Sequence, residues 1–269
     1  MLAKQSDWDA FYASMMKRTG LDLYLYRPNQ LQRRILSLAE NKGFKSLADF
    51  WTFLAQKQEN IDWFCDHLAI NVSELFRNPE KWREMETKIL PMLLEKSPRL
   101  KVWSAGCSYG AEAHTLAMVL DKKFPGGHRI IGSDIDLAAL AQAGRGEFSR
   151  NDTRAVPKEY KDYLHEKDGA FFADEKLRKY LTFKKQNLLA DRFDSGFDMI
   201  MCRNVVIYFT EEAKNELYKK FFDALKPGGI LFIGSTERIT DPESIGLETA
   251  MPFFYQKPML RNNTWRNAS

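Results

Sequence analysis

The sequence has little cysteine and little histidine, and it has no long apolar run. Its 269 residues include three cysteines and four histidines, of which the last is His165. A small, odd number of cysteines in apolar surroundings predicts buried free thiols rather than a disulfide framework. No segment reaches the roughly 18–20 apolar residues of a membrane span, and the first residues lack the apolar core of a signal peptide. We therefore expect a cytoplasmic protein that does not insert into a membrane.

The excess of positive charge is also small. The chain carries 40 basic and 36 acidic side chains, which is a formal net charge of +4. This balance does not indicate a nucleic-acid-binding protein, which would need a clear basic stripe. A hydrophobic fraction of 44% is enough to bury a sizeable core in one large domain or two smaller ones.

Residues 1–72 predict a small all-α domain. Apolar residues recur at helical spacing in segments that begin near Ser6, Pro28, Ser46 and Asn60. Basic residues lie on or near the second segment, away from its apolar stripe: Arg27, Arg33, Arg34, Lys42 and Lys45. They predict either a solvated face or a docking surface for an acidic helical partner. Residues 73–95 are predicted as a connector and a linker helix, because Ser73, Asn78 and Pro79 are cap and turn residues.

Strands alternate with helices between residues 96 and 258, which predicts a mostly parallel, doubly wound α/β sheet. The expected strands cover 100–105, 129–133, 197–202, 230–234 and a piece near 253–256, and the expected helices cover 112–123, 137–143 and 211–225. Residues 226–229, Lys-Pro-Gly-Gly, are expected to form a turn. The polar section 146–185 is predicted as an inserted β-subdomain that includes a short strand at 180–183, and residues 259–269 as a frayed polar tail.

The glycine-bearing loop after the first expected strand carries a misleading motif. Gly106-Cys-Ser-Tyr-Gly110 matches the G-x-S-x-G nucleophile elbow and lies between a strand and a helix. A hydrolase of this kind places a histidine late in the chain, after its acid, and no histidine follows His165. The esterase interpretation is therefore disfavoured.

The same loop does not suit a dinucleotide. Its spacing is G-x-x-x-G, and Glu112 follows where it would repel a pyrophosphate. Asp134 nevertheless lies at the end of the second strand, where a carboxylate can accept hydrogen bonds from a ribose diol. A ribose acceptor without a phosphate cradle suggests a nucleoside ligand with positive charge, such as S-adenosylmethionine.

Several segments, taken together and in order, resemble the chemotaxis receptor methyltransferases of the CheR family. They are Asn71–Arg77, Trp103–Ser108, Ser133–Asp136, Asn187–Leu189, Cys202–Phe209, Leu225–Gly229 and Gly234–Glu237. The resemblance implies an all-α N-terminal domain, a Rossmann-like class I methyltransferase domain and a small antiparallel β-subdomain inserted near residues 146–185. It also implies methyl esterification of glutamate side chains on the cytoplasmic helices of bacterial chemoreceptors. One departure is Gly110-Ala-Glu-Ala113, where similar proteins tend to have Gly-Glu-Glu-Pro.

The resemblance further implies S-adenosylmethionine as cofactor and S-adenosylhomocysteine as product. No metal is expected, because no histidine pairs with Cys or His at metal-ligand spacing. The cofactor-binding residues that the resemblance implies are Asn71, Ser73, Arg77, Gly106, Glu112, Asp134, Asn187, Leu188, Arg203 and Asn204. We expect Arg77 also to position the incoming carboxylate, and Tyr208 to pack or hydrogen-bond near the methyl group. Because a glutamate is already ionised at neutral pH, the transfer needs alignment and desolvation more than a general base.

Two alternatives stay open. The first is a class I methyltransferase of another substrate, although the sequence has no basic stripe with interleaved aromatics and no Asn/Asp-Pro-Pro-Tyr segment. The second is a non-catalytic scaffold that binds S-adenosylmethionine, which only the altered residues 110–113 favour. Nothing in the sequence indicates an oligomer, so a monomer is expected.

Overall fold

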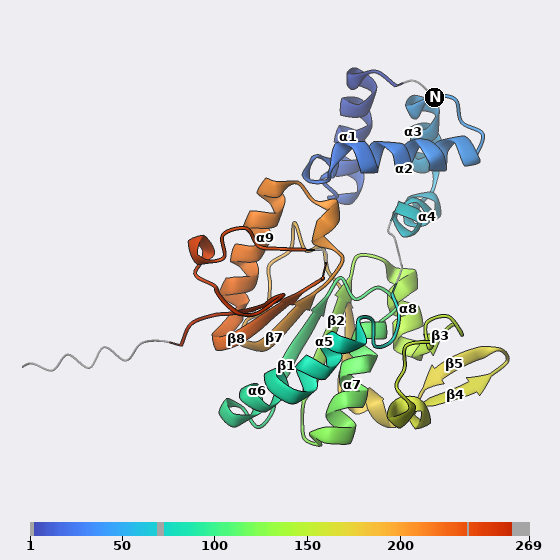
Figure 1. The fold of residues 1–269 in the computed structure, drawn as a ribbon. Helices are drawn as coiled ribbons and strands as arrows, with labels where there is room; N and C mark the ends of the chain where they lie inside the picture. The colour runs from blue at the N-terminus through green and yellow to red at the C-terminus, as the bar shows by residue number, and fades with distance from the viewer. Residues whose placement is uncertain (1–2, 69–72, 236, 260–269) are drawn as a thin grey trace, which may run out of the picture.

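The structure is a computed structural model that describes residues 3–68, 73–235 and 237–259. The expected site residue Asn71 and residues 260–269 of the expected tail lie outside these ranges. A group of helices from the N-terminal part of the chain lies at one end of a larger α/β domain (Figure 1). Within the described ranges, no helix combines the length and the apolar character needed to cross a bilayer.

The N-terminal domain consists of helices packed around aromatic side chains. Its elements are α1 (Gln5–Thr19), the 3-10 turn η1 (Leu23–Leu25), α2 (Pro28–Asn41), α3 (Leu47–Gln56) and α4 (Gln58–Leu68). The ring of Phe11 lies 6.1 Å from that of Phe50 and 5.9 Å from that of Phe64, and all three are buried. The Ser46 hydroxyl caps α3 by accepting the Asp49 N–H at 3.1 Å, as the sequence predicted. An aromatic core of this size accounts for the helical packing.

Three consecutive helical segments follow the connector and pack against the α/β domain. They are α5 (Pro79–Glu84), the π-helical segment η2 (Met85–Ile89) and α6 (Leu90–Lys96). Pro91 has no N–H to donate to the preceding turn, which explains why the helix widens immediately before it. The linker helix predicted for residues 80–95 is therefore confirmed, with a local irregularity.

The central sheet has the strand order β6-β2-β1-β7-β8-β10-β9. Its strands are β1 (Lys101–Ala105), β2 (Arg129–Asp134), β6 (Leu181–Lys185), β7 (Phe197–Cys202), β8 (Leu225–Ile233), β9 (Glu248–Met251) and β10 (Phe254–Gln256). Neighbours from β6 to β8 are parallel, whereas β10 is antiparallel to both β8 and β9. The chain winds outward in both directions from β1 and β7, so a topological switch point lies between these strands, and ligands bind at such points in open α/β sheets.

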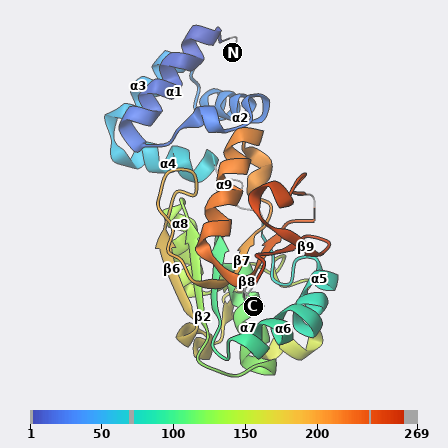
Figure 2. The same ribbon diagram turned by 90° about the vertical axis from the view of Figure 1, so that its left-hand side faces the viewer.

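Helices cover both faces of the sheet. The larger ones are α7 (Ala111–Lys123), α8 (Leu137–Arg145) and α9 (Glu211–Ala224), and Figure 2 shows α9 in front of the sheet. Val102 packs with α7 and α6 on one face, while Trp103 packs with α9 on the other. This alternation is the period of two expected for a strand that is buried on both faces.

Three sequence predictions about strands need correction. The strand expected at 180–183 within the insertion is β6, which pairs in parallel with β2 at the edge of the central sheet. The turn expected at 226–229 is a bulge inside β8, because Phe197 pairs with Leu225 and Met199 already pairs with Ile230. The strand β9 was not predicted at all, since only β10 was expected near that position.

The insertion itself forms a separate three-stranded antiparallel sheet. Its elements are β3 (Glu147–Phe148), η3 (Lys158–Tyr163), β4 (Leu164–Lys167), β5 (Ala170–Ala173) and η4 (Glu175–Lys179), in the strand order β3-β5-β4. The hydroxyls of Tyr163 and Tyr180 donate to the Asp121 carboxylate of α7 at 3.0 and 2.9 Å. These bonds hold the small sheet against the main domain.

Direct contacts join the N-terminal helices to the segment after β7. The Arg27 N–H donates to the Tyr208 carbonyl at 2.9 Å, and the Thr210 N–H donates to the Leu25 carbonyl at 2.9 Å. The Arg27 guanidinium also pairs with Glu211 at 2.8 Å. The helix α2 is therefore held above the carboxyl end of the sheet.

Candidate functional site

A cavity of about 650 Å³ lies between the N-terminal helices and the carboxyl ends of β1, β2 and β7. Every expected site residue that the structure describes lines it: Ser73, Arg77, Gly106, Glu112, Asp134, Asn187, Leu188, Arg203, Asn204 and Tyr208. These residues come from the connector, the end of β2, the first turn of α7 and the segments that follow β1, β6 and β7. The structure thus brings together residues that are far apart in the sequence.

The loop after β1 forms the floor of the cavity. Gly106 has a φ of 72°, and a Cβ there would lie 2.5 Å from a methyl carbon of Val205, so a glycine is required on both counts. The N–H of Ser108, itself at a φ of 49°, donates to the Asp134 carboxylate at 2.7 Å. The motif that resembled a nucleophile elbow is thereby held against β2, and no histidine occurs among the described residues that line the cavity.

The departure at residues 110–113 is accommodated by the fold. Gly110 caps α7 in the left-handed conformation, with a φ of 80°. Ala111 and Ala113 are both fully buried in the packed interior of α7. Glu112 alone of these residues points into the cavity, so the alanines leave its carboxylate in place.

Two carboxylates make one wall of the cavity acidic. The Ser104 hydroxyl donates to Glu112 Oε1 at 2.9 Å, and the Asp136 N–H donates to Asp134 Oδ1 at 3.0 Å. Burial raises the pKa of Asp134, while the N–H groups of Asp136 and Ser108 oppose that shift. A carboxylate has about four acceptor positions, so both groups can still accept hydrogen bonds from a ligand.

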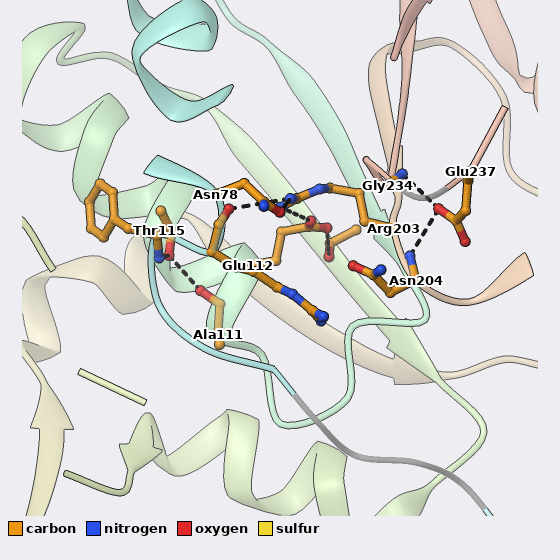
Figure 3. A network of polar contacts seen from close by, with 11 residues as sticks. Asn78, Ala111, Glu112, Thr115, Arg203, Asn204, Gly234 and Glu237 are labelled. Atoms are coloured by element: carbon orange, nitrogen blue, oxygen red, sulfur yellow. Dashed lines mark hydrogen bonds and ion pairs between the residues drawn. The ribbon is translucent and has the colours of Figure 1, made fainter. Parts of the chain in front are cut away.

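Arg203 links this wall to the connector. Its side chain is only 4% exposed and lies 3.4 Å from Glu112 Oε2. It also donates to Asn78 Oδ1 at 2.6 Å and to the Arg77 carbonyl at 3.2 Å (Figure 3). Because a buried cation needs such partners, Arg203 holds the connector at the edge of the cavity.

The backbone of the connector is strained at the same place. Phe76 and Asn78 have φ values of 56° and 61°, and a left-handed phenylalanine is unusual. The Phe76 N–H donates to the Thr115 hydroxyl of α7 at 3.0 Å, which holds this conformation. Arg77 lies between these two residues and lines the cavity.

A third group of residues closes the far end of the cavity. Leu188 is only 7% exposed and packs into the core below α9, while Asn187 Oδ1 accepts the Leu189 N–H at 3.0 Å. Gln186, which the sequence did not single out, also lines the cavity. Its Oε1 is buried without a hydrogen-bond partner in the part of the chain that the structure describes. An acceptor left in this way is suited to a ligand with N–H or O–H donors.

The opposite wall is basic and comes from α2. Four polar residues that line the cavity recur at helical spacing: Arg27, Gln30, Arg34 and Ser37. Arg33 lines the cavity as well. Lys42 and Lys45, which were predicted to share this surface, do not line it. The ammonium of Lys42 lies 4.5 Å from the centre of the Trp63 ring instead.

Tyr208 lies between the two walls. Burial raises the pKa of its hydroxyl, and the positive charges of Arg34 and Arg77 partly offset this effect. The phenol is therefore neutral at neutral pH and can donate a hydrogen bond. Among the described residues, no group of three His, Cys, Asp or Glu side chains is arranged to hold a metal ion.

Comparisons with known proteins agree on one family. Residues 71–251 match the family described as "CheR methyltransferase, SAM binding domain", and residues 6–69 match "CheR methyltransferase, all-alpha domain". A chemotaxis protein methyltransferase of Listeria monocytogenes is 40% identical over 251 residues, which cover 92% of this chain and 96% of that protein. Another from Borreliella burgdorferi is 34% identical over 254 residues, which cover 88% and 89%. The chain therefore belongs to the CheR methyltransferase family, and its cofactor is S-adenosylmethionine.

Proposed function

We propose that this protein methylates glutamate side chains on the cytoplasmic helices of bacterial chemoreceptors and acts in the cytoplasm as a monomer. The observation that carries the proposal is the division of charge in one cavity. Two carboxylates and Arg203 line the sheet side, whereas four arginines from α2 and the connector line the other side with one carboxylate, that of Glu74. A cationic methyl donor and an anionic methyl acceptor would each meet the wall of opposite charge.

The sheet side suits S-adenosylmethionine. Asp134 lies at the end of β2, where it would accept hydrogen bonds from the ribose hydroxyls. Glu112 would face the positively charged amino group of the cofactor's amino-acid part. Arg203, which lies beside Glu112, would pair with the carboxylate of the same part. The adenine would lie against Gln186, Asn187 and Leu188, because these residues offer both hydrogen-bond acceptors and an apolar surface.

The arginine side suits a glutamate presented by a helix. Arg33 is exposed and Arg34 is partly buried, and both line the cavity from α2. Arg77 would orient the carboxylate, and the neutral hydroxyl of Tyr208 would donate to one of its oxygens. The role of Arg77 is the one expected from the sequence, whereas for Tyr208 the sequence led us to expect only packing or a hydrogen bond near the methyl group.

The mechanism needs little acid–base chemistry from the protein. S-adenosylmethionine supplies a methyl group on a sulfonium, which a carboxylate oxygen can take up while the sulfur leaves as a neutral thioether. The residues around Tyr208 exclude water and hold the ionised carboxylate in line, and no proton has to be removed. Arg34 and Arg77 compensate the charge of the carboxylate as it enters a partly desolvated site.

The test is methyl transfer from tritium-labelled S-adenosylmethionine to purified receptor cytoplasmic fragments. We expect label that is released by mild base, as a methyl ester is, and that disappears when the acceptor glutamates are replaced by alanine. Arg77→Ala should lower the transfer rate while calorimetry still detects cofactor binding. Transfer at the wild-type rate by Arg77→Ala would show that this residue does not position the carboxylate.

The same experiment separates the alternatives. Cofactor binding with base-stable label on other molecules would indicate a methyltransferase of another substrate. Binding without any transfer would indicate a scaffold. Tyr208→Phe is an informative second variant, because it keeps the ring and removes only the hydroxyl.

A further inference from the structure

The loop after β7 supplies four residues of the cavity, and its first turn contains a residue with positive φ. We call residues 203–208 the cleft loop. It contains Arg203, Asn204, Val205 and Tyr208, which all line the cavity. Asn204 has a φ of 60°, in the left-handed region that side chains rarely adopt. A conformation of this kind persists only where the surroundings hold it.

The carboxylate of Glu237 provides that support. Its Oε2 accepts the N–H of Asn204 at 3.0 Å and the N–H of Gly234 at 2.6 Å (Figure 3). Burial raises the pKa of Glu237, and the N–H groups of Asn204, Gly234, Ile207 and Val205 oppose that shift. One carboxylate oxygen therefore joins the end of β8 to the Asn204 amide of the cleft loop.

Gly234 makes this contact possible. A Cβ at this position would lie 2.5 Å from Glu237 Oε2 and 3.0 Å from the Asn204 nitrogen. Its φ is not among the positive values, so the glycine serves close approach rather than an unusual backbone angle. The Gly234 and Asn204 N–H groups therefore reach the same carboxylate oxygen from two different segments of the chain.

Glu237 itself is only 5% exposed and is not among the residues that line the cavity. It therefore does not contact a ligand in the cavity, and the backbone that it holds is its direct link to the cleft loop. Hydrogen bonds to an ionised acceptor are about twice as strong as neutral ones, which suits a group that must hold a turn with a positive φ.

We propose that Glu237 is a positioning residue, which fixes the cleft loop so that Arg203, Asn204 and Tyr208 are preorganised for the cofactor and the acceptor carboxylate. The inference rests on the proposed function only for the acceptor. For the cofactor it rests on the geometry of the cleft loop, so it can be tested without a receptor.

The test compares two buried carboxylates changed in the same way. Glu237→Gln removes the charge above the cleft loop. Asp198→Asn is the matched control, because Asp198 is also 5% exposed and accepts the Lys101 N–H at 2.7 Å, but it lies at the opposite end of β7. Melting temperature, calorimetric titration with S-adenosylhomocysteine and hydrogen exchange of residues 203–208 are measured for both variants.

We expect Glu237→Gln to weaken S-adenosylhomocysteine binding about tenfold, the difference between a charged and a neutral acceptor. Exchange of the cleft-loop amides should accelerate in the same variant. Asp198→Asn should bind within about twofold of the wild type, even if its melting temperature falls as far. Wild-type affinity in Glu237→Gln, or an equal loss in both variants, would overturn the proposal.

Gly234→Ala keeps the test decisive if Glu237→Gln does not fold. The added methyl displaces the carboxylate without removing its charge, so affinity should fall and exchange of the cleft loop should rise again. Unchanged exchange in this variant would count against the proposal. If receptor fragments are not methylated but Glu237→Gln still binds the cofactor product weakly, the acceptor is wrong and the role of Glu237 stands.

Discussion

The two walls of the cavity are built in different ways. The sheet wall holds its polar groups in fixed networks: Asp134 accepts two backbone N–H groups, and Glu112 is bonded to Ser104 and Arg203. On the α2 wall, Arg27 pairs with Glu211 and Arg34 donates to the His67 carbonyl at 2.9 Å, whereas Arg33 is exposed. The first arrangement suits one small ligand in one pose, whereas the second suits a macromolecular surface that must be released after each turnover.

This difference predicts which measurements each wall should affect. Changes in the sheet wall should lower cofactor affinity and, where a buried charge is involved, stability. Changes in the α2 wall should alter the apparent affinity for the acceptor and its salt dependence, and leave the cofactor affinity unchanged.

The largest effect is expected for Arg203→Ala. The change removes a cation that is 4% exposed, and it leaves the Glu112 carboxylate without that partner. Breaking a buried pair in this way costs about 3–5 kcal/mol. We expect the free energy of unfolding in urea to fall by about that amount and calorimetry to detect no cofactor binding.

Arg150→Ala is the control for this prediction. Arg150 pairs with Glu166 at 2.5 Å, but its side chain is 71% exposed. Such a surface pair contributes about 0–1 kcal/mol to stability. The free energy of unfolding and the cofactor affinity should therefore both stay near the wild-type values. If Arg203→Ala bound the cofactor normally, the link between the connector and the sheet wall would not serve binding.

A smaller effect within the sheet wall is expected for Asp134→Asn. The amide keeps the shape but loses the charge, and a hydrogen bond to a charged acceptor contributes about 1.5–3 kcal/mol. Cofactor affinity should therefore fall about 10- to 100-fold in a calorimetric titration. Asp194→Asn is the control, because it changes an exposed carboxylate that lies 2.8 Å from Lys184. It should change the cofactor affinity by less than about twofold. Equal affinities for the two variants would contradict a ribose-binding role for Asp134.

The sheet wall was also the easier of the two to predict from sequence. The strand Phe197–Cys202 and the helix beginning at Glu211 were expected with nearly their observed bounds, because their apolar patterns are continuous or strongly periodic. The edge strand β6 was misplaced, since Leu181–Lys185 is polar and only its pairing with β2 shows where it belongs. The Pro-Gly-Gly bulge in β8 has turn composition, and tertiary pairing overrides it.

The α2 wall could be predicted only in part. The basic residues were visible, but the direction in which they face depends on contacts between Arg27 and Tyr208, which are far apart in sequence. This is why Lys42 and Lys45 were grouped with Arg33 although they lie away from the cavity. Glu237 was noticed only within a family motif, since nothing local shows that its carboxylate holds the Asn204 amide.

The α2 wall is tested by Arg33→Glu. Reversal of an exposed charge in the cavity lining should raise the KM for receptor fragments about three- to tenfold at low salt, and less at high salt, because screening weakens the repulsion. The affinity for S-adenosylhomocysteine should not change. Lys45→Glu makes the same charge change outside the cavity and should leave the KM near the wild-type value. The same KM shift in both variants would show that the effect comes from the net charge of the protein and not from the position of Arg33.

The smallest effect is expected where the two regions meet, at Asp66 of α4 and Asp136 at the start of α8. Burial, the charge of Asp136 and a hydrogen bond to it raise the pKa of Asp66 to about 6, Asp62 adds to the shift and His67 opposes it. A carboxyl whose folded pKa is raised binds more protons in the folded state. Its contribution to stability is therefore complete at low pH and is lost as pH rises from about 4 to about 6.

Asp66→Asn should remove this loss, because an amide keeps a hydrogen-bond donor towards Asp136 at every pH. Solvent screens the partly exposed pair, so we expect a gain of less than about 1 kcal/mol in the free energy of unfolding at pH 7.5 and none at pH 4. Asp62 lies one turn away and accepts a hydrogen bond from Gln58 at 2.9 Å. In Asp62→Asn, the change in the free energy of unfolding relative to the wild type should depend less on pH. A gain that is the same at both pH values would mean that the charge of Asp66 does not destabilise the contact between α4 and α8.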